Sequence, residues 1–468
     1  MVRIDQLYTS CLSQGAYYII SNGEVAIIDP LREIDIYIKK ASEDNAVIKY
    51  IFETHFHADF VSGHLSLAEK TQAPIIYGPL ATPTFESTIA TDNQIFKLGD
   101  CTIKVIHTPG HTMESSCFLL IDDNGKEHAL FTGDTLFLGD VGRPDLAQKS
   151  TSLSQEELAG FLYDSIHTKL LKLPDALTIY PGHGAGSACG KNLSKETIGN
   201  LGEQKKTNYA LQSSLTKEDF IREVTDGLTP PPAYFPQNVA LNQHGYEDIQ
   251  NVLDNSLVYL TSHEFEEKMQ SKDVVILDTR SEIEFINGHI PNSIFIGISG
   301  SFAPWVGAIL KNVHQKLLVI TNKGKEKEVL IRLARVGFDN VLGFLGEGME
   351  NWSKEGKNIS KIKSIQPIEF SIINSLSTIL DVRKTSEFQQ GHLAIENLIN
   401  IPLDQLSENL ENLDKNKAFA IHCAGGYRSV IAASILLNNG FTNITNIEGG
   451  INAIQKEGYS IVSTITQA

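Results

Sequence analysis

The sequence predicts an α/β protein of several domains, namely a layered α/β sandwich followed by two copies of a smaller α/β unit. At 468 residues, the chain is too long for a single hydrophobic core. Residues 1–200 alternate short apolar runs, turns and segments of helical spacing. After residue 254 the sequence repeats itself at a constant offset, so that Asp278 corresponds to Asp381 and Gly337 to Gly440.

Bulk composition limits the classes of function. With 41% hydrophobic and 20% charged residues, the chain has the composition of a globular protein. Its net charge of −17 disfavours nucleic acid as a partner, and no apolar run is long enough to predict a membrane span. The N-terminus lacks an apolar signal-peptide core, and the five cysteines form no CxxC pair. We therefore expect a cytoplasmic protein with free thiols.

In residues 1–200, turns and apolar runs predict the strands of the sandwich. Asn22-Gly23 and Asn124-Gly125 each predict a hairpin, because Asn-Gly is the strongest short turn pattern. Helical spacing predicts helices at 34–41 and 62–71. Further strands are predicted at 47–52, 74–78, 102–106 and 176–180. Strands facing strands, with helices outside them, indicate a layered sandwich.

From residue 201 to 254 the periodicity weakens. Thr229-Pro-Pro-Pro-Ala-Tyr-Phe-Pro236 is incompatible with a helix interior or a central strand. Aromatic residues between the prolines suggest an ordered extension that wraps the first domain, although the composition also fits a flexible linker. We therefore divide the chain into 1–200, 201–254, 255–360 and 361–468, the last two being the repeated units.

Residue types that bind metals follow four of the predicted strands. They are His55, His57 and Asp59 after 47–52, His111 after 102–106, Asp134 after Ala129-Leu130, and His183 after 176–180. Imidazole and carboxylate groups are the ligands of borderline divalent metals. A histidine on one Pro-Gly turn is common, but such groups at four strand ends are hard to obtain by chance. The sequence therefore predicts a metal site.

The same residues resemble the metallo-β-lactamase superfamily over residues 1–200. Thr54-His-Phe-His-Ala-Asp-Phe60, Pro109-Gly-His-Thr112, Thr132-Gly-Asp134 and Gly182-His-Gly184 match its ligand motifs THxHxDH, PGHT, TGD and GHG. The resemblance implies an αββα sandwich, commonly with two zinc ions that hydrolyse esters, amides or thioesters. Here Phe60 replaces the final histidine of the first motif. Its loss disfavours a binuclear hydrolase of the glyoxalase II kind.

His55, His111 and Asp134 remain as two imidazoles and one carboxylate, a set typical of non-haem Fe(II) enzymes that use O₂. This pattern resembles the persulfide dioxygenase branch of the superfamily, which oxidises glutathione persulfide or a similar small persulfide. The resemblance makes His57, Asp59 and His183 supporting groups rather than iron ligands, with a second metal as the alternative.

Two further residues are candidates for substrate binding. Arg143 could hold the anionic substrate or sulfite, since a guanidinium pairs with oxyanions through two hydrogen bonds. An ordinary ion pair with Asp140 or Asp145 is an equally good interpretation. Cys189 could border the pocket and accept sulfur transiently, but an unreactive buried thiol is the favoured alternative.

In the last repeat, Cys423 lies between the strand 418–422 and the helix 430–437, with Arg428 five residues later. Backbone N–H groups of such a loop can stabilise a thiolate nucleophile. The loop is also similar to the phosphate cradle of cysteine phosphatases. Asp381-Val-Arg383, Glu387-Phe388 and Gly391-His392 instead resemble the rhodanese family, whose α/β domains have central parallel sheets and whose cysteine carries a persulfide.

The corresponding loop of the first repeat, 320–326, has no cysteine, and this copy is therefore expected to be inactive. The domain order resembles the bacterial fusion of a persulfide dioxygenase with two rhodanese units. The resemblance implies Fe(II) as the cofactor, with zinc as the alternative. It also implies oxidation of a thiol persulfide by O₂ to sulfite, and transfer of sulfur from Cys423 to give thiosulfate, in sulfide detoxification.

Two other hypotheses remain open, a zinc thioester hydrolase with an appended sulfurtransferase and a persulfide sensor or carrier with a vestigial first domain. We expect small molecules, and neither nucleic acid nor membrane, as partners, and a homo-oligomer of unspecified size.

Overall fold

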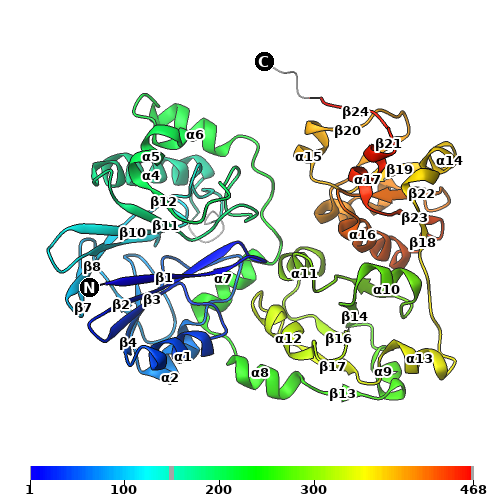
Figure 1. Ribbon diagram of the computed structural model, residues 1–468, viewed down its shortest axis with the longest axis horizontal. Coiled ribbons are helices and arrows are strands. Elements are labelled where there is room, and N and C mark those ends of the chain that lie inside the picture. The colour runs from blue at the N-terminus through cyan, green and yellow to red at the C-terminus, as the bar shows by residue number, and fades with distance from the viewer. Residues whose placement is uncertain (1, 147–151, 465–468) are drawn as a thin grey trace. The chain divides into compact units, whose positions relative to one another are not determined.

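The computed structural model describes residues 2–146 and 152–464 (Figure 1). Two compact units divide the chain. The first comprises residues 1–252 together with 334–337, and the second comprises 253–333 and 338–468. In the described ranges, no helix combines the length and the apolar character that crossing a membrane requires.

Two six-stranded sheets form the centre of the first unit. One sheet has the order β1 (Arg3–Thr9), β2 (Gln14–Ser21), β3 (Glu24–Ile28), β4 (Val47–Phe52), β5 (Ile75–Tyr77) and β6 (Thr88–Ile89). The other has the order β12 (Gly199–Asn200), β11 (Thr178–Pro181), β10 (Glu127–Gly133), β9 (Ser116–Ile121), β8 (Cys101–His107) and β7 (Ile95–Leu98). An apolar cluster that includes Tyr17, Phe52, Phe118 and Phe131 contains residues of both sheets. The sheets therefore pack face to face.

Helices cover the outer faces of the two sheets (Figure 1). Tyr37 and Leu67 share a buried cluster with β2, β3 and β4; they belong to α1 (Asp35–Glu43) and α2 (His64–Thr71). A second buried cluster joins the other sheet to three helices, α4 (Gln155–Thr168), α5 (Leu201–Thr207) and α6 (Lys217–Thr225). In it, Leu162, Leu201 and Phe220 of these helices pack with residues of β9, β10 and β11. The expected αββα sandwich is confirmed.

The segment after residue 200 is ordered and mostly helical. Besides α5 and α6 it forms α7 (Phe235–His244) and α8 (Ile249–Ser256). Tyr234 and Phe235 are buried, and Pro236 lies at the beginning of α7, where the missing N–H of proline costs no helical hydrogen bond. The side chain of Asn242 in α7 donates to the carbonyl oxygens of His57 and Phe60, both at 2.8 Å. The extension therefore holds the loop that carries the candidate metal ligands.

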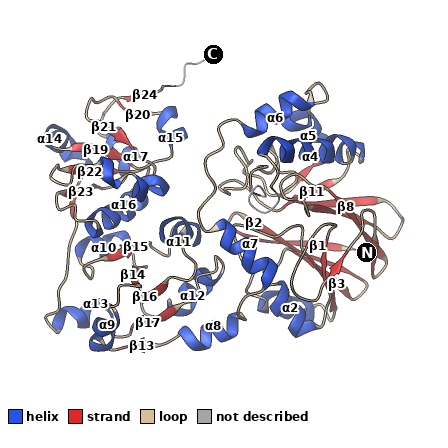
Figure 2. Cartoon of the chain, turned by 180° about the vertical axis from the view of Figure 1, so that it is seen from behind, coloured by secondary structure: helices blue, strands red, loops and turns tan. Residues whose placement is uncertain are grey.

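The second unit contains two five-stranded parallel sheets of matching strand order (Figure 2). The first runs β13 (Tyr259–Leu260), β17 (Val341–Leu345), β16 (Lys316–Ile320), β14 (Val274–Asp278) and β15 (Ser293–Phe295). The second runs β18 (Lys363–Ile365), β23 (Ile444–Ile447), β22 (Phe419–His422), β19 (Thr378–Asp381) and β21 (Leu398–Asn400). A two-stranded sheet pairs β20 (His392–Leu393) with β24 (Ile461–Val462).

Helices accompany each parallel sheet. The first copy has α9 (Ser262–Lys268), α10 (Glu282–Asn287), α11 (Phe302–Leu310), α12 (Glu326–Ala334) and α13 (Gly348–Lys354). The second has α14 (Phe370–Leu376), α15 (Thr385–Gln390), α16 (Tyr427–Asn438) and α17 (Gly450–Lys456).

Buried ion pairs at equivalent positions show that the repeat is structural. Arg280 pairs with Asp278 and Arg383 with Asp381, each at 2.6 Å. Each arginine also donates at 2.8 Å to the carbonyl oxygen at the end of the next helix, Gly288 or Gly391. A guanidinium satisfied in this way joins the end of the strand to the end of the helix that follows it. The predicted duplication is therefore confirmed.

Candidate metal centre and sulfur-transfer site

Three buried side chains from three loops form one candidate metal site. His55 follows β4, His111 follows β8 and Asp134 follows β10. The Asp134 Oδ2 atom lies 3.5 Å from His111 Nε2 and 3.9 Å from His55 Nε2. Ligand atoms that share an ion at about 2.1 Å lie roughly 3 to 3.5 Å apart. Slight closure would thus make these three atoms ligands of one metal.

Unsatisfied atoms support the same site. Both His111 Nε2 and Asp134 Oδ2 are buried and have no hydrogen-bond partner among the described residues. Buried polar atoms are normally paired, because leaving one unpaired costs about 1–3 kcal/mol. A divalent cation would satisfy both atoms, so the residues present fit a metal ion.

Hydrogen bonds fix which imidazole nitrogen faces the metal position. His111 Nδ1 lies 2.8 Å from the Arg143 carbonyl oxygen, which can only accept. His55 Nδ1 lies 2.9 Å from Thr54 Oγ1, and that hydroxyl donates to Asp29 Oδ2, also at 2.9 Å. Each Nδ1 therefore carries the proton, which leaves Nε2 with a free lone pair as a ligand.

Electrostatics favours the ligand forms of these groups. Burial, assisted by His57, lowers the pKa of His55 well below its usual range, so that the ring is neutral. Burial raises the pKa of Asp134, but the adjacent His183 outweighs this effect and the pKa falls below its usual value. Asp134 is therefore a carboxylate. A neutral imidazole and an ionised carboxylate are the forms that bind metal.

Of the expected supporting groups, His183 and Asp59 extend the site directly. His183 Nδ1 lies 2.7 Å from Asp134 Oδ1, and His183 Nε2 lies 2.8 Å from Asp59 Oδ2. Burial lowers the pKa of His183, but the two carboxylates outweigh it and raise the pKa well above its usual value. Asp59, His183 and Cys189 are near enough to one another to form a second candidate group of ligands.

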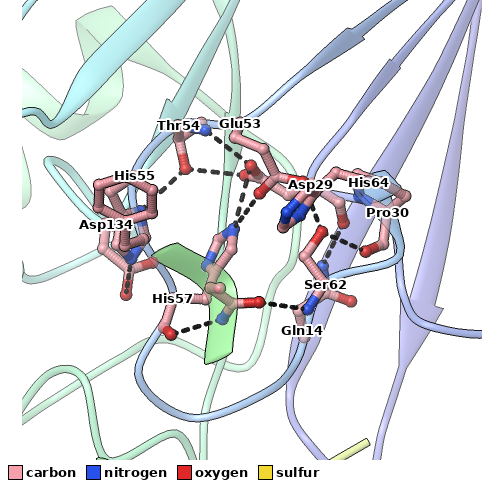
Figure 3. Close-up of polar contacts among 12 residues, drawn as sticks. Gln14, Asp29, Pro30, Glu53, Thr54, His55, His57, Ser62, His64 and Asp134 are labelled. Carbon is pink, nitrogen blue, oxygen red and sulfur yellow. Dashed lines mark hydrogen bonds and ion pairs between the residues drawn. The ribbon is translucent and has the colours of Figure 1, made fainter. Parts of the chain in front are cut away.

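His57 belongs to a different cluster. Its Nε2 lies 3.1 Å from Asp29 Oδ1 and 3.3 Å from Glu53 Oε2 (Figure 3). Burial lowers the pKa of His57, but these carboxylates outweigh it and raise the pKa to about 10. The sequence interpretation missed Asp29 and Glu53, because single acidic residues at strand ends carry no recognisable pattern.

Phe60 is fully buried beside His57, with the two ring centroids 4.3 Å apart. An apolar ring thus follows Asp59 in this chain, at the position where the superfamily motif has a histidine.

Arg143 and Cys189 are both buried at the edge of this region. Arg143 pairs with Asp145 through two bonds of 2.6 and 2.7 Å, and donates to the carbonyl oxygens of Thr229 and Ala188. All three nitrogens of its guanidinium are therefore engaged within the protein, as in the ion-pair interpretation. Burial raises the pKa of the Cys189 thiol well above its usual value, which favours the unreactive form.

Cys423 occupies a separate site in the second unit. It follows β22, is 1% exposed, and accepts a hydrogen bond from the Gly426 N–H to Sγ at 3.1 Å. Gly426 has a φ of +110°, a conformation that side chains other than hydrogen resist. The glycine therefore lets the loop turn its N–H towards the sulfur, as expected for a cradle that stabilises a thiolate.

The predicted arginine has a carboxylate partner. Arg428 donates two bonds to Glu387, at 2.6 and 2.8 Å. Tyr427, between the cradle and Arg428, donates to the carbonyl oxygen of Gly297 in the first copy at 2.7 Å. The first copy thus contacts the Cys423 loop, a contact that sequence reasoning missed because it joins two distant segments.

Comparisons with known proteins identify a family for each part of the chain. The model of the Metallo-beta-lactamase superfamily matches residues 11–183, and that of the Rhodanese-like domain matches residues 261–355 and 371–457. A metallo-beta-lactamase structure from Staphylococcus aureus is 32% identical, with a TM-score of 0.65, and the match covers 73% of this chain and 98% of that one.

Curated relatives match a little over a third of the chain. A probable hydroxyacylglutathione hydrolase of Schizosaccharomyces pombe is 31% identical over 38% of this chain and 67% of its own length. The hydroxyacylglutathione hydrolase of Rhizobium etli is 37% identical over 34% of this chain and 57% of its own length. The chain thus spans roughly three-fifths of these relatives.

Proposed function

Since the chain belongs to the metallo-beta-lactamase superfamily and carries two rhodanese-like domains, we propose that it is a persulfide dioxygenase coupled to a sulfurtransferase. The observation that carries the proposal is the buried group of two imidazoles and one carboxylate, His55, His111 and Asp134. That set, with open positions beside it, is typical of Fe(II) enzymes that use O₂. Phe60 supports the proposal because it takes the place of a further ligand.

In the proposed reaction, one thiol persulfide, one O₂ and one water give the free thiol, sulfite and two protons. Fe(II) held by His55, His111 and Asp134 would supply the redox chemistry on the terminal sulfur. The chain's own contribution is to present two neutral Nε2 atoms and one carboxylate oxygen, and to keep the site buried.

Sulfur transfer would use Cys423. Its thiolate attacks the outer sulfur of a second persulfide, which releases the thiol and leaves a persulfide on Cys423. Sulfite then attacks the outer sulfur of the cysteine persulfide, so that thiosulfate leaves and the thiolate returns. The Gly426 N–H is placed to stabilise the anionic sulfur at both stages.

A zinc hydroxyacylglutathione hydrolase is the second candidate, favoured by the names of the curated relatives. The deciding experiment purifies the full chain without oxygen and measures its iron and zinc content. It then compares O₂ uptake with glutathione persulfide and hydrolysis of a hydroxyacylglutathione. We expect iron and persulfide-dependent O₂ uptake. Hydrolysis by the zinc form, without O₂ uptake by the iron form, would overturn the proposal.

A further inference from the structure

His57 is close to the candidate metal but turned towards other partners. Its ring centroid lies 4.3 Å from that of His55, and both side chains are buried. An imidazole so near a metal position is a potential fourth ligand. Figure 3 shows its ring directed instead towards Asp29 and Glu53, where Nε2 meets two carboxylate oxygens at 3.1 and 3.3 Å.

The two carboxylates are themselves held in place. Asp29 accepts the backbone N–H and the hydroxyl of Thr54, at 2.8 and 2.9 Å. Glu53 accepts the hydroxyl of Ser62, and its Oε1 lies 3.4 Å from His64 Nδ1. Buried carboxylates require hydrogen-bond donors, because desolvation without compensation is costly. Both lie within ion-pair distance of His57 Nε2.

The backbone around His57 is fixed independently of these carboxylates. Asn242 donates to the His57 and Phe60 carbonyl oxygens, and the Phe56 N–H donates to Glu114 Oε1 at 3.0 Å. The orientation of the His57 ring is thus decided by side-chain rotation and by which acceptors the ring finds.

We propose that Glu53, together with Asp29, is a positioning residue that keeps His57 out of the metal's coordination sphere and holds the number of protein ligands at three. This inference rests on the metal site of the proposed function. It adds the reason why part of the metal's coordination sphere stays free of protein ligands. Glu53 is the residue to change, since Asp29 also anchors Thr54 and through it His55.

The test counts coordinated histidines in the full chain loaded with Co(II). Each coordinated imidazole gives one strongly shifted, exchangeable N–H proton signal in the paramagnetic NMR spectrum. The unchanged protein should show two such signals, from His55 and His111. Glu53→Ala should show three, because it removes one of the two carboxylates that hold the His57 ring away from the metal. Glu53→Met serves as a second variant that fills the space without accepting a hydrogen bond, and should also show three.

Controls separate this effect from a disturbed loop. Glu114→Met removes a carboxylate that holds the same loop through the Phe56 N–H, and should keep two signals. Adding His57→Asn to Glu53→Ala should restore two. Three signals in the unchanged protein, or two in both Glu53 variants, would overturn the inference.

The outcome is distinguishable from that of the proposed function. If the iron form takes up no O₂ while the signals change from two to three, the dioxygenase proposal fails and the role of Glu53 stands. If the iron form of the unchanged protein takes up O₂ with persulfide and the Glu53 variants still show two signals, the dioxygenase proposal stands and the role of Glu53 fails. In the supported case, O₂ uptake by Glu53→Ala should fall by roughly 10- to 100-fold.

Discussion

At the scale of single residues, the metal site depends on hydrogen bonds that orient its ligands. Thr54 accepts from His55 Nδ1 and donates to Asp29, so one hydroxyl joins the ligand to a buried carboxylate. A threonine before a histidine has no predictive value in the sequence. Its role follows only from the placement of Asp29, which is at the end of β3, next to β4 in the sheet.

Thr54→Val should weaken metal binding by about 10- to 100-fold, because the valine cannot accept the Nδ1 proton of His55. The affinity is measured by competition with a chelator of known strength. Thr108→Val is the matched control, since the buried Thr108 hydroxyl bonds to Ser115, Cys117 and Thr135 in the described part of the chain, and none of these is a candidate metal ligand. Equal affinities of both variants and the unchanged protein would contradict this role.

Cys423→Ser should leave sulfite release intact and abolish thiosulfate formation, because the serine hydroxyl cannot carry a sulfane sulfur. Both products are measured after incubation with glutathione persulfide and O₂. Cys101→Ser, at a buried thiol that accepts from the Ser21 hydroxyl, controls for loss of a thiol alone and should form thiosulfate normally. Thiosulfate from the Cys423 variant at the unchanged rate would exclude the relay.

At the scale of elements, the Asn-Gly pattern correctly predicted the position of both hairpins. The first has the predicted two-residue turn, and the second has a longer turn. Asn22 and Gly23 have φ values of +45° and +76°, the left-handed pair that a two-residue hairpin needs. At the second hairpin the turn spans Asp122 to Lys126, and the Asp122 carboxylate accepts from Asn124 and Lys126. A side-chain acceptor thus lengthened a turn whose position was predicted correctly.

A loop of the first copy of the repeat contacts the candidate sulfur-transfer site, although this copy lacks the cysteine. Tyr427 begins α16 and donates to Gly297, and a Cβ on Gly300 would lie 2.5 Å from the Tyr427 ring. The absence of a side chain at Gly300 therefore allows the ring to pack there. The copy without the cysteine thus supports the loop that presents Cys423.

Gly300→Ala should slow thiosulfate formation without changing O₂ uptake, because displacement of Tyr427 shifts the Gly426 N–H away from Cys423. Tyr427→Phe should have a smaller effect, since it removes one hydrogen bond worth about 0.5–1.5 kcal/mol. Tyr459→Phe is the control, because Tyr459 packs on Phe370 in the second copy, the copy that also contains Tyr427. A parallel fall of both activities in Gly300→Ala would show general damage instead.

At the scale of the whole molecule, metal and thiol sites belong to separate compact units. A metal that binds the folded first unit and not its unfolded chain stabilises it by mass action. Removing the metal with a chelator should therefore lower the unfolding temperature of the first unit and leave that of the second unchanged. Differential scanning calorimetry of the full chain measures both transitions. A single transition that shifts as a whole would show that the units unfold as one.

The sequence by itself determined the sandwich, the duplicated α/β unit, the candidate metal ligands and the cysteine of the strand-to-helix loop. These follow from local patterns, since periodicity sets strands and helices and strand ends present side chains at a common edge. Residues 201–254 were less predictable, because the α-helices that begin there are short and three consecutive prolines, 230–232, separate α6 from α7.

Only the tertiary structure decided which of the candidate residues act together. His57, two residues from a ligand, turns to Asp29 and Glu53, while His183, far along the chain, contacts Asp134. Arg143 is engaged by Asp145, and Tyr427 by the other copy. The physical reason is that buried charges and donors take the nearest partners in space, and chain spacing does not encode that choice.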